Sequence, residues 1–138
     1  MAYDALIERN MSLPRAKIFA GLVDFGGIKK ILPDAIASCE CQGQGVGAVR
    51  TIKLAAGGTV VERLEVAHEE SVFAYTILEN DALPLTNYCA VVTLADNGKG
   101  GTHVSYGSNW TPTGNATDDE IRGMLEGLYN AILDGMAK

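Results

Sequence analysis

Two charged residues, Arg50 and Glu62, stand within apolar faces of consecutive predicted strands. Arg50 alternates with Ile52 and Leu54, and Glu62 occupies the same alternating positions as Val60. A period of two is typical of a strand with one buried face, so both charges are expected on the buried side of a sheet. A guanidinium can hold a carboxylate or an enolate, and a carboxylate can act as a general base.

The connection between these two strands decides whether the charges meet. The sequence from residue 55 to residue 58 reads AAGG. If the hairpin closes through residues 55–57 with glycine in the left-handed conformation, Ile52 lies opposite Val60 and Arg50 lies opposite Glu62. Two interpretations are open. The pair is either an ion pair at the sheet margin or a polar group inside an apolar cavity, where Arg50 holds a ligand and Glu62 removes a proton.

Aromatic residues on the later strands form a second group of candidates. Tyr75, Tyr88 and Tyr106 each share a strand face with apolar residues, and Trp110 follows on the face of Tyr106. Rings with a polar tip suit a cavity that binds a flat or oxygenated ligand, and filling of the core is the alternative. We expect all four to contact a ligand, with Tyr75 also assisting Arg50 and Glu62 in catalysis.

The segment GQGVGAVR carries Gly43, Gly45 and Gly47 at every second position before Arg50. A phosphate-binding loop needs a helix directly after its glycines, because the helix N-terminus supplies free N–H groups. The alternating residues that follow predict a strand from about residue 46 to residue 54. We therefore interpret the glycines as a connection between two strands.

The elements that position these residues follow from periodicity and turn signals. Strands are predicted at about residues 3–12, 36–42, 46–54, 59–67, 71–79, 86–95 and 102–110, with helices at 14–25 and 28–32 between the first two. Thr117 and Glu120 match a capping box at the start of a long amphipathic helix. Its apolar stripe includes Leu128, which we expect to contact a ligand. A curved sheet around this helix would bury the stripe and leave space for a ligand.

Composition argues against some kinds of partner and favours one cellular location. With 11 basic and 17 acidic residues the net charge is −6, which argues against nucleic acid as a partner. Apolar runs too short for a bilayer and an acidic N-terminus argue against membrane insertion and favour a cytoplasmic location. The three cysteines are expected to be reduced, and the two histidines lack the spacing of metal ligands. We expect one domain over residues 1–138, with no metal and no cofactor.

The order of elements also carries a resemblance. With the segments LVDFGGIKKILPDAI, GQGVGAVRTIKLAAGGTVVERLE, YTILENDALPLTNY and EGLYNAILDGM, the chain resembles the SRPBCC superfamily. This START-like, helix-grip group includes polyketide cyclase/dehydrase-like proteins and plant abscisic-acid receptors. The resemblance implies an α+β helix-grip fold in which an antiparallel sheet of about seven strands wraps around the C-terminal helix.

The resemblance leaves two functions open. The first is binding of a small hydrophobic, aromatic or polyketide-like ligand that bears a carbonyl group, by a monomer or a homodimer. The second is a cofactor-free cyclase, aldolase or lyase that uses Glu62, Arg50 and tyrosines for acid–base chemistry. The sequence itself does not separate them, because the family spans carriers, receptors and enzymes.

Overall fold

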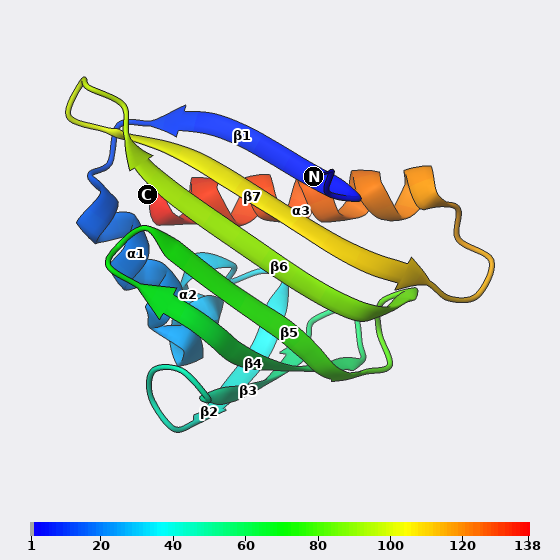
Figure 1. Ribbon diagram of the computed structural model, residues 1–138. Helices are drawn as coiled ribbons and strands as arrows, with labels where there is room; N and C mark the ends of the chain where they lie inside the picture. Colours follow the sequence, from blue (N-terminus) through cyan, green and yellow to red (C-terminus); the bar gives the residue numbers. More distant parts are fainter. Residues whose placement is uncertain (1) are drawn as a thin grey trace.

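The computed structural model describes residues 2–138 and consists of a seven-stranded sheet, three α-helices and one short 3-10 helix (Figure 1). In chain order the elements are β1 (Ala5–Met11), α1 (Arg15–Val23), η1 (Phe25–Gly27), α2 (Ile28–Ile31), β2 (Ile36–Gln42), β3 (Val49–Leu54), β4 (Thr59–His68), β5 (Val72–Asn80), β6 (Leu85–Asp96), β7 (Thr102–Pro112) and α3 (Asp118–Met136).

The sheet has the strand order β1-β7-β6-β5-β4-β3-β2, and each strand is antiparallel to its neighbours. The strands from β2 to β7 follow one another as a meander through short turns, whereas β1 pairs with β7. The first and second strands in the chain therefore form opposite edges of the sheet. This arrangement confirms the predicted helix-grip fold, with the short helices between the first two strands.

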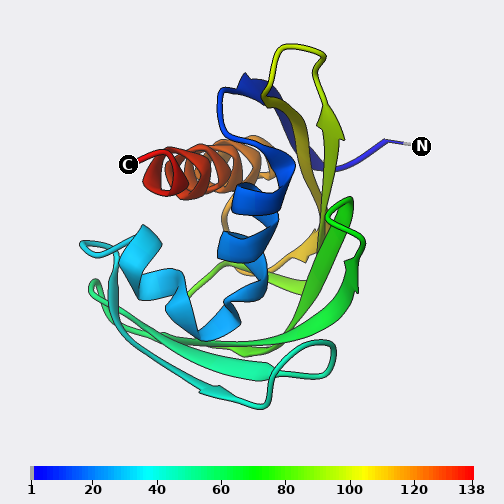
Figure 2. The ribbon, with the colours of Figure 1, turned by 90° about the vertical axis from the view of Figure 1, so that its left-hand side faces the viewer.

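The sheet curves strongly, and the helices occupy its concave side (Figure 2). Bulges interrupt the pairing of β4 with β5 and of β6 with β7, where Asn87 has a φ of 53°. An extra residue in one strand bends that strand and increases its twist. In Figure 2 the curved strands form an open arc, with α3 across one side of the opening and α1 and α2 inside it.

Helix α3 covers the concave face and begins with the predicted capping box. The Thr117 hydroxyl accepts a hydrogen bond from the Glu120 backbone, and the Glu120 carboxylate accepts one from the Thr117 backbone. These two bonds satisfy backbone donors that the first helical turn leaves free. The buried stripe of α3 consists of Ile121, Leu125, Tyr129, Ile132 and Leu133.

Some element boundaries differ from those predicted. Strand β3 begins at Val49 instead of residue 46, because Gly47 has a φ of 95° and donates to the Leu64 carbonyl outside the regular ladder. Helix α1 spans Arg15–Val23, and Pro14 precedes it without a side-chain cap. The residues after it form the separate 3-10 helix η1. As interpreted from the sequence, the glycine-rich segment connects β2 to β3 and leads into no helix.

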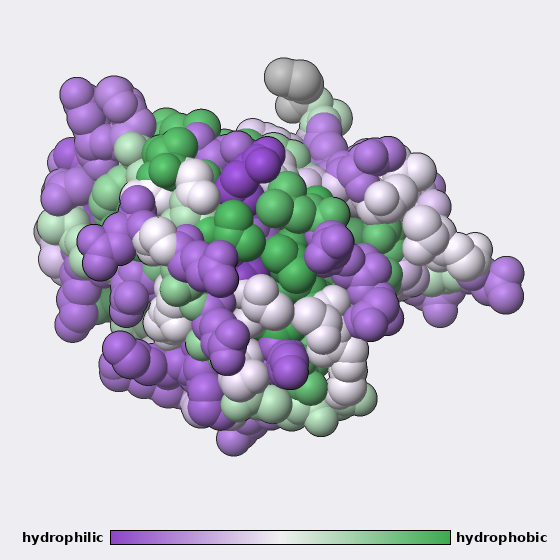
Figure 3. All heavy atoms as spheres, turned by 90° about the horizontal axis from the view of Figure 1, so that it is seen from below, coloured by the Kyte–Doolittle hydropathy of each residue, from purple (hydrophilic) through white to green (hydrophobic). Residues whose placement is uncertain are grey.

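The surface is mixed in polarity. Seen from below, it shows hydrophobic residues gathered near the centre and hydrophilic residues around them (Figure 3). Several partly exposed apolar side chains lie on strands, among them Val66 and Leu78. Within residues 2–138, every helix is too short or too polar to span a lipid bilayer.

Candidate functional site

Arg50 and Glu62 are paired in the register that the hairpin predicted. They are directly opposite on β3 and β4, as are Ile52 and Val60. Nε of Arg50 donates to Oε1 of Glu62 at 2.8 Å, and Nη2 lies 2.7 Å from the same oxygen. The two side chains are only 6% and 9% exposed. The pair is therefore buried on the concave side of the sheet, and the interpretation as an exposed pair at the sheet margin is wrong.

The rest of the guanidinium is held by the 3-10 helix η1. Nη1 of Arg50 donates to the Phe25 carbonyl at 3.1 Å, and the guanidinium carbon lies 3.8 Å from the centre of the Phe25 ring. A cation over an aromatic face is attracted by the ring quadrupole. Burial is the largest single effect on the pKa of Arg50 and lowers it, but the attraction and hydrogen bond of Glu62, together with nearby Tyr75 and Tyr106, raise that pKa above its usual value. Arg50 is thus a fixed cation with a partner at each nitrogen.

Both arginine nitrogens that face Glu62 share one of its oxygens. Oε1 accepts from Nε and lies close to Nη2, whereas Oε2 has no hydrogen-bond partner among residues 2–138. A carboxylate oxygen has two lone pairs and accepts hydrogen bonds readily. The pair therefore leaves one free acceptor, and Glu62 itself lines the cavity described below.

Buried phenol groups form a hydrogen-bonded chain beside this pair. The Tyr75 hydroxyl lies 2.7 Å from that of Tyr106 and 3.3 Å from that of Tyr88. The Tyr88 hydroxyl lies 2.6 Å from that of Tyr129 on α3, which donates to Ser108. The Tyr106 and Tyr129 rings stack with their centres 4.0 Å apart. The chain thus joins strands β5, β6 and β7 to the long helix.

The chain has a single direction because each phenol carries one proton. Since Tyr129 donates to Ser108, Tyr88 must donate to Tyr129, and then Tyr75 to Tyr88 and Tyr106 to Tyr75. Burial raises the pKa of all four phenols, that of Tyr129 to about 12. Tyr75, which is at the cavity, has therefore already used its proton and offers only an acceptor to a ligand.

A cavity of about 420 Å³ adjoins the Arg50–Glu62 pair. Apolar residues make up most of its wall, and they come from α2, the β3–β4 hairpin, the β5–β6 loop and α3. The side chains with polar groups in the wall are Asp34, Arg50, Glu62 and Tyr75. An apolar hollow with a few polar groups on one side is typical of a small-molecule site.

Only some of the residues predicted to contact a ligand lie in the cavity wall. Arg50, Glu62, Tyr75 and Leu128 line the cavity. Tyr106 lines a much smaller neighbouring space, of about 10 Å³.

Tyr88 and Trp110 are buried outside both of these walls. The indole N–H of Trp110 is buried without a partner among residues 2–138. Tyr88 belongs to the phenol chain behind Tyr75, so its connection to the cavity runs through that residue.

Two contributors to the site were absent from the sequence-based prediction. Tyr129 completes the phenol chain, and Phe25 holds Arg50 through its carbonyl and its ring. Tyr129 lies four residues after Leu125 on the buried stripe of α3, so helical periodicity could have identified it. The Phe25 carbonyl had no comparable signal, because its position depends on how η1 packs against β3.

Two loops of the cavity wall, the β3–β4 turn and the β5–β6 loop, lie against each other. Asp81 Oδ1 accepts from the Thr59 backbone at 2.6 Å, and the Asp81 backbone donates to the Thr59 carbonyl at 3.1 Å. Ala55, Ala56 and Leu83, which belong to these loops, line the cavity. The two hairpin ends are thus joined by hydrogen bonds beside the cavity wall.

The sequence matches a family model, and the fold is similar to that of several solved structures. The family model described as "Polyketide cyclase / dehydrase and lipid transport" matches residues 8–138. Among solved structures, XoxI from Bacillus cereus is 23% identical with a TM-score of 0.81, over 99% of this chain and 94% of its own. An uncharacterized protein from Bacillus thuringiensis is 21% identical with a TM-score of 0.80, over 96% and 95% of the two chains.

The protein Ara h 8.0201 has the same fold. It is 22% identical with a TM-score of 0.79, over 96% of this chain and 93% of its own. No curated protein matches the sequence.

Proposed function

Because this chain belongs to the Polyketide cyclase / dehydrase and lipid transport family, we propose that its cavity binds a small hydrophobic ligand, aromatic or polyketide-like, that bears a carbonyl group. The observation that carries the proposal is the buried Arg50–Glu62 pair in the wall of an otherwise apolar cavity of about 420 Å³. A volume of this size suits a ligand of two or three fused rings. The spare N–H groups of Arg50 are the donors available to a ligand carbonyl, because the Tyr75 proton is used by Tyr88.

Binding of a neutral naphthyl ketone tests this proposal. The dye Prodan, an uncharged propionyl naphthalene, changes its emission when it leaves water, so its affinity can be measured by direct titration. Leu128→Trp should weaken the binding of Prodan about tenfold or more, because the larger ring fills the cavity. Leu78→Trp is the matched control, since Leu78 is 43% exposed and outside the cavity wall. Equal affinity for the two variants and the unmodified protein would contradict the proposal.

A cofactor-free enzyme is the second candidate, and the free Oε2 of Glu62 favours it. Glu62 would take a proton from the carbon next to the ligand carbonyl, while Arg50 would hold the oxygen of the resulting enolate. The C–H electron pair becomes the enolate double bond, and Glu62 holds the proton, which exchanges with solvent before a proton or deuteron is returned to carbon. The buried charge remains zero throughout this transfer, which avoids the cost of an unpaired buried charge.

Hydrogen exchange on a ketone separates this enzyme from a simple carrier. In D₂O the protein should exchange the acetyl protons of 2-acetylnaphthalene for deuterium faster than buffer does, as followed by proton NMR. Glu62→Gln should abolish the acceleration. Glu65→Gln should retain it, because Glu65 lies on the same strand but pairs with Arg63 outside the cavity wall. If Prodan binds but no exchange is accelerated, the chain is a carrier.

A further inference from the structure

The charge of Arg50 is already matched inside the protein. Its guanidinium contacts Glu62 through Nε and Nη2 and the Phe25 carbonyl through Nη1. One buried cation therefore faces one buried anion. A ligand carboxylate placed here would leave the site with an excess negative charge in a region of low dielectric, and such a charge is costly to bury.

Apart from the spare N–H groups of Arg50, the hydrogen-bonding groups that the cavity wall offers a ligand are acceptors. Oε2 of Glu62 has no partner among residues 2–138. Tyr75 donates to Tyr88 and accepts from Tyr106, so it offers the cavity a lone pair only. A ligand with a hydroxyl group would supply the donor that these acceptors need. A bond from a hydroxyl to a carboxylate is among the stronger hydrogen bonds in proteins.

The charges around the cavity also disfavour anions. Asp34 lies in the wall and is exposed, and the whole chain has a net charge of −6. Among residues 2–138, Arg50 is the only lysine or arginine in the wall. Lys29, on the adjacent helix α2, donates to the Ile36 carbonyl and does not line the cavity. An anionic ligand would therefore find one exposed carboxylate in the wall, Asp34, and, among the residues that the structure describes, no lysine or arginine there except Arg50, which Glu62 already pairs.

We propose that this cavity selects uncharged ligands that carry a hydroxyl group, a phenol or an enol, which donates to Oε2 of Glu62, and that it rejects carboxylates of the same shape. This inference rests on the proposed function, because it names the chemical class of ligand for the same cavity.

Three compounds of one scaffold test the selectivity. They are 2-substituted naphthalenes that carry a hydroxyl, a methoxy or a carboxylate as their single polar group. Their affinities are measured by displacement of Prodan, at a pH where the naphthol is neutral and the acid is ionised. The hydroxyl compound should bind about tenfold more tightly than the methoxy compound. The carboxylate should bind at least about tenfold more weakly than the methoxy compound.

Glu62→Gln should reverse the ranking. Without the glutamate charge Arg50 becomes an unmatched buried cation, so the carboxylate compound should gain at least about tenfold in affinity. The advantage of the hydroxyl over the methoxy compound should shrink to about threefold or less. Glu65→Gln is the matched control, since it makes the same chemical change at a residue whose carboxylate pairs with exposed Arg63. It should leave the ranking unchanged.

The outcomes distinguish the two proposals. If Prodan and all three naphthalenes fail to bind, the proposed function fails and this inference with it. If Prodan binds but the carboxylate competes as well as the hydroxyl compound, only the inference is overturned. If Glu62→Gln does not fold, the order of the three affinities for the unmodified protein still tests the inference. The double variant Arg50→Met/Glu62→Leu, which leaves no charge, should then bind the hydroxyl and methoxy compounds about equally.

Discussion

Arg50 and Glu62 face each other across neighbouring strands, with Nη2 of the arginine 2.7 Å from Oε1 of the glutamate and less than a tenth of either side chain exposed. Each charge is therefore tolerated in the interior only because the other is present. The same geometry makes the pair a specific feature of the cavity wall, since the surrounding side chains are mostly apolar.

Removal of either partner should destabilise the protein. Arg50→Met or Glu62→Gln should lower the free energy of unfolding by about 3–5 kcal/mol, because each leaves the other group buried without its counter-charge. The double variant should lose much less than the sum of the two, as measured by urea unfolding in a double-mutant cycle. Arg63→Met and Glu65→Gln form the control, as this more exposed pair should contribute less than about 1 kcal/mol. A coupling near zero for Arg50 and Glu62 would contradict the buried pair.

The buried phenols should make the protein sensitive to alkali. In the unfolded chain a tyrosine ionises near pH 10, as is usual for a free phenol. In the folded chain burial raises the pKa of these tyrosines, that of Tyr129 to about 12. The folded state therefore holds more protons than the unfolded state in this range. Its stability should be complete below about pH 10 and fall as the pH rises from about 10 to about 12.

Urea unfolding at a series of pH values measures this loss. Each buried phenol should contribute up to about 1.4 kcal/mol per pH unit, and Tyr88→Phe should reduce the slope by up to that amount. Tyrosinate absorbance from the buried phenols should rise together with the loss of circular dichroism. If these phenols ionised near pH 10 while the fold persisted, the buried chain would be disproved.

How far the site could be predicted depends on whether its residues are neighbours in local structure. The register of Arg50 and Glu62 follows from alternation along two strands and the length of one turn, so the sequence was sufficient. The link between Tyr88 and Tyr129 crosses from sheet to helix, and the packing of α3 determines it. Periodicity alone specifies no such contact.

The same limit applies to the cavity wall. Helical periodicity assigns both Leu125 and Leu128 to the inner side of α3. The structure separates them, since Leu125 is fully buried in the core and Leu128 lines the cavity. That difference depends on where the sheet curves away from the helix, which in turn depends on bulges whose positions the sequence pattern did not reveal.

Glycines in α3 should respond differently to alanine. A Cβ at Gly127 would meet no atom within 4 Å, so Gly127→Ala should raise the free energy of unfolding by about 1 kcal/mol through helix propensity. A Cβ at Gly135 would overlap the Ile31 carbonyl oxygen of α2, so Gly135→Ala should lower it by about 1–3 kcal/mol. Thermal unfolding compares the two variants. Equal destabilisation by both would mean that α3 also packs closely at Gly127.

The β3–β4 and β5–β6 loops, which line the cavity, should open as one unit. Asp81 joins them through two hydrogen bonds with Thr59, and Gly58 lies so close to Ala82 that a side chain there would collide with it. Loss of the Asp81 carboxylate removes the bond to the Thr59 N–H but leaves the backbone bond in place. Asp81→Ala should therefore loosen the loops without unfolding the strands, and a bound ligand should escape faster.

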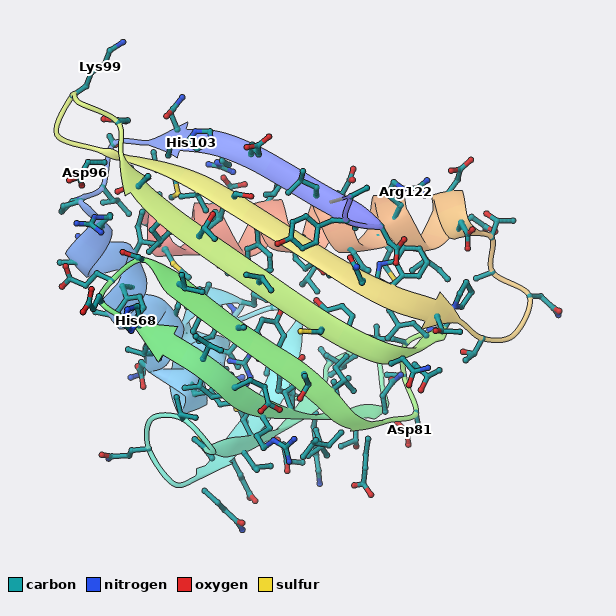
Figure 4. All side chains as sticks on the ribbon, viewed as in Figure 1. His68, Asp81, Asp96, Lys99, His103 and Arg122 are labelled. Carbon is teal, nitrogen blue, oxygen red and sulfur yellow. The ribbon has the colours of Figure 1, made fainter. Side chains whose placement is uncertain are left out.

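Hydrogen exchange and the rate of Prodan release measure this effect. Amide exchange in residues 55–59 and 81–84 should rise about fivefold to tenfold in Asp81→Ala, with a similar rise in the release rate. Asp96→Ala is the matched control, because Asp96 is another exposed carboxylate with a hydrogen-bonded partner and lies at the opposite end of the sheet from Asp81 (Figure 4). It should alter neither rate. If exchange in both loops were as slow as in the strand centres, with or without ligand and in both variants, these loops would not control access to the cavity.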